Sequence, residues 1–239
     1  MKRRRSLLLI VLLLSTAATV VVAVLGALVR YEPAAYRAAC REEDTDAAKS
    51  TETLSRVTEL QQELQIAKPD WGGSFAAADF NAFLRDSFER GGTFDGTLDR
   101  RVRSPRVWTD GDRLTIAARY QASPFASLES EWTTTVVSVE LKVWVVSKKS
   151  NTVAVEVCRL AAGALPISAQ RYLDRLGEAA RESNTEVTWY RNAGHPVGLF
   201  RFYASQPQAP VQIQSVTVAD GRLTVAGKGV QALADAANP

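Results

Sequence analysis

The feature that most constrains this chain is a long apolar run over residues 7–29, which only Ser15, Thr16 and Thr19 interrupt. Four cationic residues, at positions 2–5, come directly before it. A helix of about 20 apolar residues matches the roughly 30 Å hydrocarbon core of a bilayer, and basic flanks stay in the cytoplasm. The pattern predicts a basic cytoplasmic tip at residues 1–5 and a transmembrane anchor at 6–29. The rest of the chain is then expected outside the cytoplasmic (inner) membrane.

Two other interpretations of the N-terminus compete with the anchor. A cleaved signal peptide has an apolar region of about 7–15 residues and a small-x-small cleavage site. This run is longer, and the best candidate site, Leu25-Gly26-Ala27, has a bulky leucine where a small residue is preferred. A lipoprotein needs an apolar residue where Arg37 stands before Cys40. We therefore expect an uncleaved single-pass anchor.

Composition argues against several classes of site. The net charge of +3 includes the four positive charges at residues 2–5, so the external part is near neutral. A nucleic-acid-binding domain would carry a concentrated basic patch, and we expect no nucleic-acid partner. The single histidine, His195, and two distant cysteines, Cys40 and Cys158, make no zinc set. An oxidising compartment would permit a disulfide between the two cysteines, and a buried free thiol at Cys158 is the alternative.

No catalytic signature stands out. The chain has no Gly-x-Ser-x-Gly elbow, phosphate loop or dinucleotide fingerprint. His195 lies in a glycine-rich loop, where an exposed histidine is a simpler interpretation than a general base. We expect no enzyme activity, no metal and no cofactor.

The segment over residues 30–68 predicts a helical stalk. Pro33 suits the first turn of a helix, and Pro69 disfavours helix in the residue before it. Apolar residues recur at spacings of three and four, at Leu54, Val57, Leu60 and Leu64. This stripe would either pack on the domain or pair with another chain, which leaves self-association open.

Residues 69–231 predict one α+β domain, followed by a disordered tail at 232–239. A turn is expected at 71–74, and amphipathic helices at 75–90 and 168–182. Between and after the helices the apolar period is two, and a long strand at 131–146 has one wholly aliphatic face. Further strands are expected at 113–117, 152–158, 186–191, 199–203, 211–218 and 222–226. These segments predict an antiparallel sheet packed on one or two helices.

The order of these elements resembles the YpmS-type and LmeA-type bacterial envelope proteins of the TULIP-like lipid-binding superfamily. The resemblance rests on Phe75, Phe80, Asn81 and Leu84 in the first helix and on Leu165-Pro166 before the second. It implies a curved sheet around a long helix, no catalytic residues, and an apolar groove that holds a phospholipid or acyl ligand. In this chain the groove would be lined by Phe75, Phe80, Phe83, Leu84, Val143, Val145, Tyr172, Leu173 and Leu176.

The sequence therefore predicts a non-enzymatic, membrane-anchored protein that binds a lipid or other apolar ligand between helix and sheet. The alternative is an anchored structural or protein-interaction module of the envelope with a closed core. Periodicity does not separate an open groove from a filled one, because both need the same apolar faces.

Overall fold

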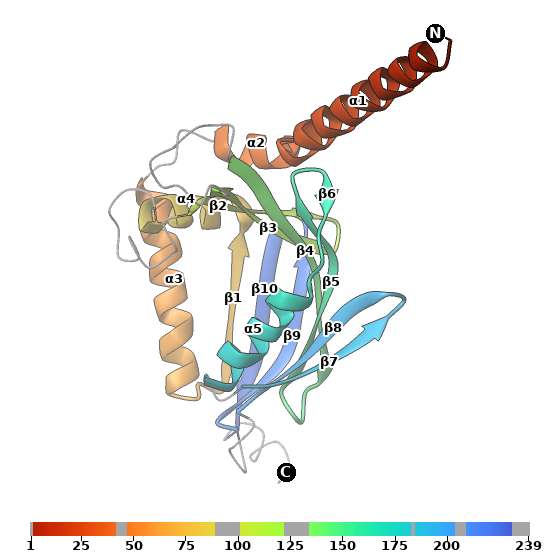
Figure 1. The fold of residues 1–239 in the computed structure, drawn as a ribbon. Helices are drawn as coiled ribbons and strands as arrows, with labels where there is room; N and C mark the ends of the chain where they lie inside the picture. The colour runs from red at the N-terminus through yellow and green to blue at the C-terminus, as the bar shows by residue number, and fades with distance from the viewer. Residues whose placement is uncertain are drawn as a thin grey trace.

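The computed structural model describes residues 2–41, 47–88, 101–121, 134–182, 185–203 and 209–230. It is an α+β structure with a large antiparallel sheet and several helices, which confirms the fold class at that level (Figure 1). The tail predicted to be disordered, 232–239, lies outside the described residues.

The large sheet is built on the long strand that the alternation predicts. That strand, β4 (Thr134–Ser147), pairs with β3 (Arg113–Gln121) on one side and β5 (Thr152–Ala162) on the other. β2 (Val102–Asp110) extends the sheet beyond β3. β8 (His195–Phe202) and β7 (Thr185–Asn192) extend it beyond β5, and the short β6 (Leu165–Pro166) also pairs with β5.

A second sheet has the order β1-β10-β9 and corrects one prediction. Residues 71–74, expected as a turn, lie in β1 (Asp70–Ala76), which pairs with β10 (Arg222–Gly229); β9 (Val211–Ala219) pairs with β10 in turn. β1 and β10 lie too close together at Gly72 for a side chain, since a Cβ there would be 2.8 Å from the Val225 carbonyl oxygen. The Trp71 ring likewise covers Gly227, where a Cβ would meet it at 2.1 Å.

Two helices cover one face of the large sheet, which we call the inner face. α4 (Ala77–Phe88) packs on β2, and Leu114 of β3 joins its cluster. α5 (Gln170–Glu182) packs on β7, where Gly177 lies beside the Trp189 indole. The register places Leu141 opposite Leu114, and Val143 in one row with Val155, Gly198 and Trp189, so all of these residues share the inner face. β9 packs against β4.

The predicted stalk packs on the domain. It contains α2 (Ala34–Arg41) and α3 (Ala47–Gln65), and residues 42–46 lie outside the described part. α3 packs against α4 and β1, and the Thr53 hydroxyl donates to the Asp79 carbonyl at 3.3 Å. Of the apolar stripe, Val57, Leu60 and Leu64 are half-buried and Leu54 is 42% exposed. The domain, rather than a free stalk, thus accounts for the stripe.

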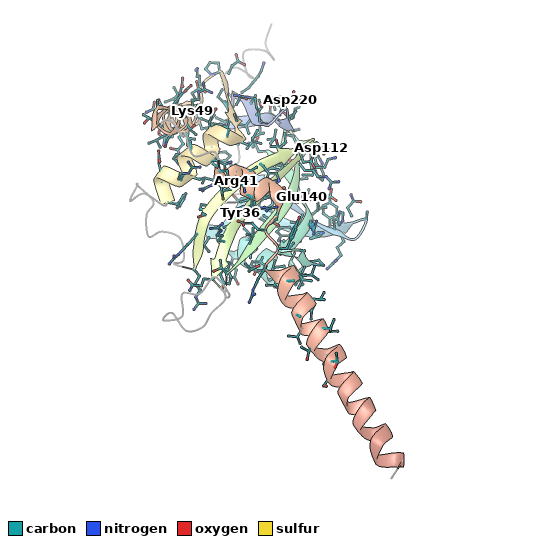
Figure 2. All side chains as sticks on the ribbon, turned by 90° about the horizontal axis from the view of Figure 1, so that it is seen from above. Tyr36, Arg41, Lys49, Asp112, Glu140 and Asp220 are labelled. Carbon is teal, nitrogen blue, oxygen red and sulfur yellow. The ribbon has the colours of Figure 1, made fainter. Side chains whose placement is uncertain are left out.

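α2 lies on the opposite, outer face, across β2. Its Tyr36 is fully buried against Ala117 and Val136, and the Tyr36 hydroxyl donates to the Ser104 carbonyl oxygen at 2.8 Å. In Figure 2, seen from above, Tyr36 and Arg41 lie on this helix over the sheet.

Two buried asparagines pair with the backbone of neighbouring strands. Asn81 of α4 donates to the Val107 carbonyl of β2 at 2.8 Å and accepts from the Val107 N–H at 2.7 Å. Asn151, in the β4–β5 turn, forms the same pair of bonds with β9, at Val211 and Ile213. Each side-chain amide thus satisfies one backbone C=O and one backbone N–H at the edge of a sheet.

α1 (Lys2–Val29) is a continuous helix that projects away from the body (Figure 1). Its described valines and leucines from Val20 to Leu25 are 46–68% exposed. The side chains of α1 are described without a break only from Ala18 onward. Over the described residues, no single helix is long and apolar enough to cross a membrane. One bent pair, Ala18–Val29 with Ala34–Arg41 at 40°, meets the length and composition requirement together.

Candidate functional site

The structure distributes the nine predicted groove residues over four places. Phe80, Phe83 and Leu84 lie in the cluster between α4 and β2, and Phe75 lies on β1 opposite Leu223. Val143 and Val145 lie on β4. Tyr172, Leu173 and Leu176 lie on α5.

The α4–β2 cluster is a closed core. Phe83, Leu84 and Val107 are buried, and Phe80, Phe88 and Leu114 pack around them. The Phe80 and Phe83 rings meet at 5.7 Å between centroids, a normal distance for a tilted aromatic pair. These side chains therefore stabilise the fold.

The inner face of β4 is different. Val139, Leu141, Val143 and Val145 lie in the central strand of the sheet but are only half-buried, as is Val155 beside them. The middle of a sheet that is covered on one face normally holds its most buried residues. The aliphatic face is therefore incompletely covered.

On α5, neighbouring apolar residues point in different directions. Leu173 is buried, whereas Tyr172 and Leu176 are 49% and 50% exposed. Only Leu173 of these three lines a groove; the other two are about half exposed and do not line it. Ser168 accepts a hydrogen bond from the Gln170 N–H at 3.4 Å, as expected for the residue that caps this helix.

The groove that Leu173 lines measures about 300 Å³ and lies in a notch of the large sheet. β5 pairs with β8 only as far as Glu156 and with β6 from Ala161 onward, so residues 157–160 have no strand on that edge within the described chain. A bulge at Cys158, where Leu141 pairs with Val157 and Glu140 with Arg159, bends β5 at the same point. The apolar wall is formed by Val157, Leu160, Pro166, Ile167 and Leu173.

Polar side chains form the rim of this groove. Arg159, Arg191 and His195 all line it and are exposed. The His195 Nδ1 lies 2.8 Å from the Glu156 carboxylate, whose side chain is 14% exposed. Since the two arginines carry permanent charge, the rim offers cationic donors next to an apolar wall.

The cysteine in the groove is a poor nucleophile. Burial, followed by the Glu156 carboxylate, raises the pKa of Cys158, so the thiol stays protonated at neutral pH. The sequence left a bridge to Cys40 open; in the structure both thiols are free, and Cys40 packs beside Tyr36 and Ala117. Among the described residues, no three His, Cys, Asp or Glu side chains gather where they could hold a metal ion.

The outer face beside Cys158 carries paired charges. Arg113 pairs with Glu140, and Lys142 with Asp112 at 2.6 Å. Asp112 and Glu140 are labelled on this side of the sheet in Figure 2. A second hollow, of about 490 Å³, lies over the exposed side of α2, and its described lining is Ala34, Arg37, Ala38 and Arg41. These four described residues include no large apolar side chain.

The C-terminal end of α1 is fixed to the body close to the groove, at a contact we call the joint. The Ala164 N–H donates to the Leu28 carbonyl at 2.8 Å, and the Thr135 hydroxyl donates to the Val29 carbonyl at 2.6 Å. Gly163, with φ of +61°, lies so close that a Cβ there would stand 2.3 Å from both carbonyl oxygens. β6 and the groove residues Pro166 and Ile167 follow directly along the chain.

Comparison of the chain with protein-family models, curated proteins and solved structures gives no match. Sequence reasoning found Leu173 but missed Val157, Leu160, Ile167 and the polar rim. The one local signal was the break of the strand pattern at residues 163–167, next to the notch.

Proposed function

We propose that this chain is a single-pass protein of the cytoplasmic membrane whose extracytoplasmic domain binds a lipid acyl chain or another apolar ligand in the groove beside α5. The binding is non-enzymatic. α1 is the anchor, and residues 2–5 lie on the cytoplasmic side.

The observation that carries the proposal is the open aliphatic surface inside the domain. The half-buried inner face of β4, with Val155 of β5 beside it, and the groove in the sheet notch lie on the side that α5 covers. Ligand sites of this kind combine an apolar wall with a few polar groups, and here these are Arg159, Arg191 and His195. The resemblance of the sequence to lipid-binding envelope proteins points the same way.

The anchor is supported by what surrounds α1. An apolar helix that projects from the body with its valines and leucines exposed needs an apolar environment, which a bilayer provides. Binding without covalent chemistry is supported by the Cys158 thiol in the groove, which burial keeps protonated.

The second candidate is an anchored interaction module with a closed core, including self-association through α3. The filled α4–β2 cluster and the exposed Leu54 favour it. If this candidate holds, Leu54→Asp abolishes a dimer of the full chain in crosslinking, while the domain carries no lipid.

The deciding experiment is photo-crosslinking of the full chain in membranes with a diazirine-labelled, clickable fatty acid, followed by peptide mapping. We expect label on β5 and α5. Leu160→Trp fills the groove and should remove that label, whereas Val146→Trp, on an exposed position of β4, should retain it.

Competition by unlabelled fatty acids measures the apolar contribution. Each methylene removed from water is worth about 0.8 kcal/mol, so competition expressed against the free aqueous concentration of the fatty acid should strengthen roughly fourfold per carbon until the groove is filled. Uniform labelling that Leu160→Trp leaves unchanged, with no dependence on chain length, would contradict a lipid site and favour the closed module.

A further inference from the structure

The joint determines which side of the body faces the bilayer, given the proposed membrane anchor. α1 ends with its Leu28 and Val29 carbonyls bound by Ala164 and Thr135. On the following residues, Glu32 pairs with Arg119 at 2.8 Å and Tyr36 is buried in the outer face. Because the contacts fall on both sides of the helix end, the body has no free swivel at this point.

The β7–β8 hairpin projects sideways from the body. In Figure 1 α1 leaves next to β6 toward the upper right and the hairpin projects to the right, and in Figure 2 the hairpin lies at the right edge of the body while α1 leaves toward the bottom. The groove extends from the joint to the hairpin. Of its lining residues, Pro166 and Ile167 adjoin the joint, and Arg191, His195 and Pro196 belong to the hairpin. Asp220, at the β9–β10 turn, lies on the opposite side of the body from α1 (Figure 2).

The side chains at the end of this hairpin suit a membrane surface. Tyr190 is 42% exposed, and Arg191 and His195 are exposed beside it. Tyrosine favours the headgroup level of a bilayer, and arginine binds phosphate oxygens through its planar fork of donors. Glu186 of the same hairpin is paired with Arg201 away from the tip, at 3.5 Å.

We propose that the hairpin tip, residues 190–196, rests on the phospholipid headgroups of the membrane that α1 crosses, with Arg191 bound to lipid phosphate. The joint holds the tip there. The mouth of the groove, between the tip and β6, consequently opens at the headgroup layer, where an acyl chain enters without crossing water.

The test uses the full chain in phosphatidylcholine vesicles, with and without phosphatidylglycerol, on a Cys40→Ala, Cys158→Ala background. A bimane probe at Asn192→Cys reports the tip, and one at Asp220→Cys reports the far side. Headgroup-spin-labelled lipid should quench the Asn192 probe and leave the Asp220 probe unquenched. Phosphatidylglycerol should increase quenching at the tip. Arg191→Gln should reduce about fivefold the ratio of molecules whose hairpin tip contacts the headgroups to molecules whose tip is free of them.

A matched glycine pair tests the joint. Gly163→Ala places a Cβ against the α1 carbonyls, whereas Gly111→Ala carries the same backbone strain, with φ of +57°, and meets nothing within 4 Å. Tip quenching should fall in Gly163→Ala only. Thr135→Val, which removes the bond to Val29 without adding bulk, gives the second variant if Gly163→Ala does not fold.

The result that overturns this inference is a chain that floats with the vesicles and takes up the clickable fatty acid, yet shows equal quenching at Asn192 and Asp220. Quenching at the tip that both joint variants leave unchanged overturns the role of the joint. A chain that does not float with vesicles instead contradicts the proposed anchor, so the two failures are distinguishable.

Discussion

Asn81 gives the sharpest test of how this fold is held together. Its side-chain amide makes two hydrogen bonds to Val107, at 2.8 and 2.7 Å, and both residues are buried. Asn81→Ala leaves the Val107 N–H and C=O without these partners. An unsatisfied buried polar group costs about 1–3 kcal/mol, so the substitution should lower the free energy of unfolding by about 3 kcal/mol.

The assay is urea unfolding of the full chain in detergent micelles, followed by tryptophan fluorescence, since Trp108 adjoins Val107 on β2. In a domain of this size the same loss lowers Tm by roughly 6–12 °C. Asn192→Ala, at an exposed turn position, is the control and should change stability by less than about 0.5 kcal/mol.

Asn81→Asp separates the two bonds. An ionised carboxylate accepts from the Val107 N–H but faces the Val107 carbonyl oxygen without a proton, so its pKa in the folded state should rise above the unfolded value. The penalty relative to the parent is then full at neutral pH and shrinks as pH falls through that raised pKa, because the carboxylic acid donates and accepts as the amide does. A loss below about 1 kcal/mol for Asn81→Ala, or a penalty for Asn81→Asp that is independent of pH, would refute this account of the β2 edge.

Three further outcomes follow from the packing. Asn151→Ala should cost about 1 kcal/mol more than Asn151→Gly in urea unfolding, because φ there is +50° and both variants lose the bonds to β9. Gly227→Ala should cost about 3 kcal/mol or more, since its Cβ meets the Trp71 ring, whereas Gly221→Ala, in open space, should cost only about 1 kcal/mol. Burial raises the pKa of Tyr36, so unfolding from about pH 10 upward releases its proton and stability falls; Tyr36→Phe should flatten that alkaline loss.

Most of the sheet was predictable because its signals are local. Alternation over residues 137–145 and the Asp-Gly turns at 110–111 and 220–221 predict β3, β4, β9 and β10 from a few neighbouring positions. β1 was missed because its glycines are needed for close packing against β10, which follows about 150 residues later in the chain.

The site was less predictable, for a related reason. Tyr172, Leu173 and Leu176 belong to one helix, yet only Leu173 is buried and lines the groove, and helical spacing alone does not show how far a neighbouring sheet covers an apolar stripe. The notch itself exists because β8 stops pairing at Glu156 and a bulge falls at Cys158. Neither the end of a strand pairing nor a bulge has a distinct pattern in a single sequence.

The joint would fix the orientation of the body relative to the proposed anchor α1. The last carbonyls of a helix have no partner within it, and at the end of a membrane helix water normally solvates them. Here Ala164 and Thr135 replace that water at two of them. Two such bonds, at a net value of about 1 kcal/mol each, favour the attached arrangement roughly thirtyfold over a free one, before the burial of Tyr36 is counted. With α1 in a bilayer as proposed, that ratio is large enough to hold the body in one orientation to the membrane for nearly all of the time, which a freely jointed anchor of the same length would not do.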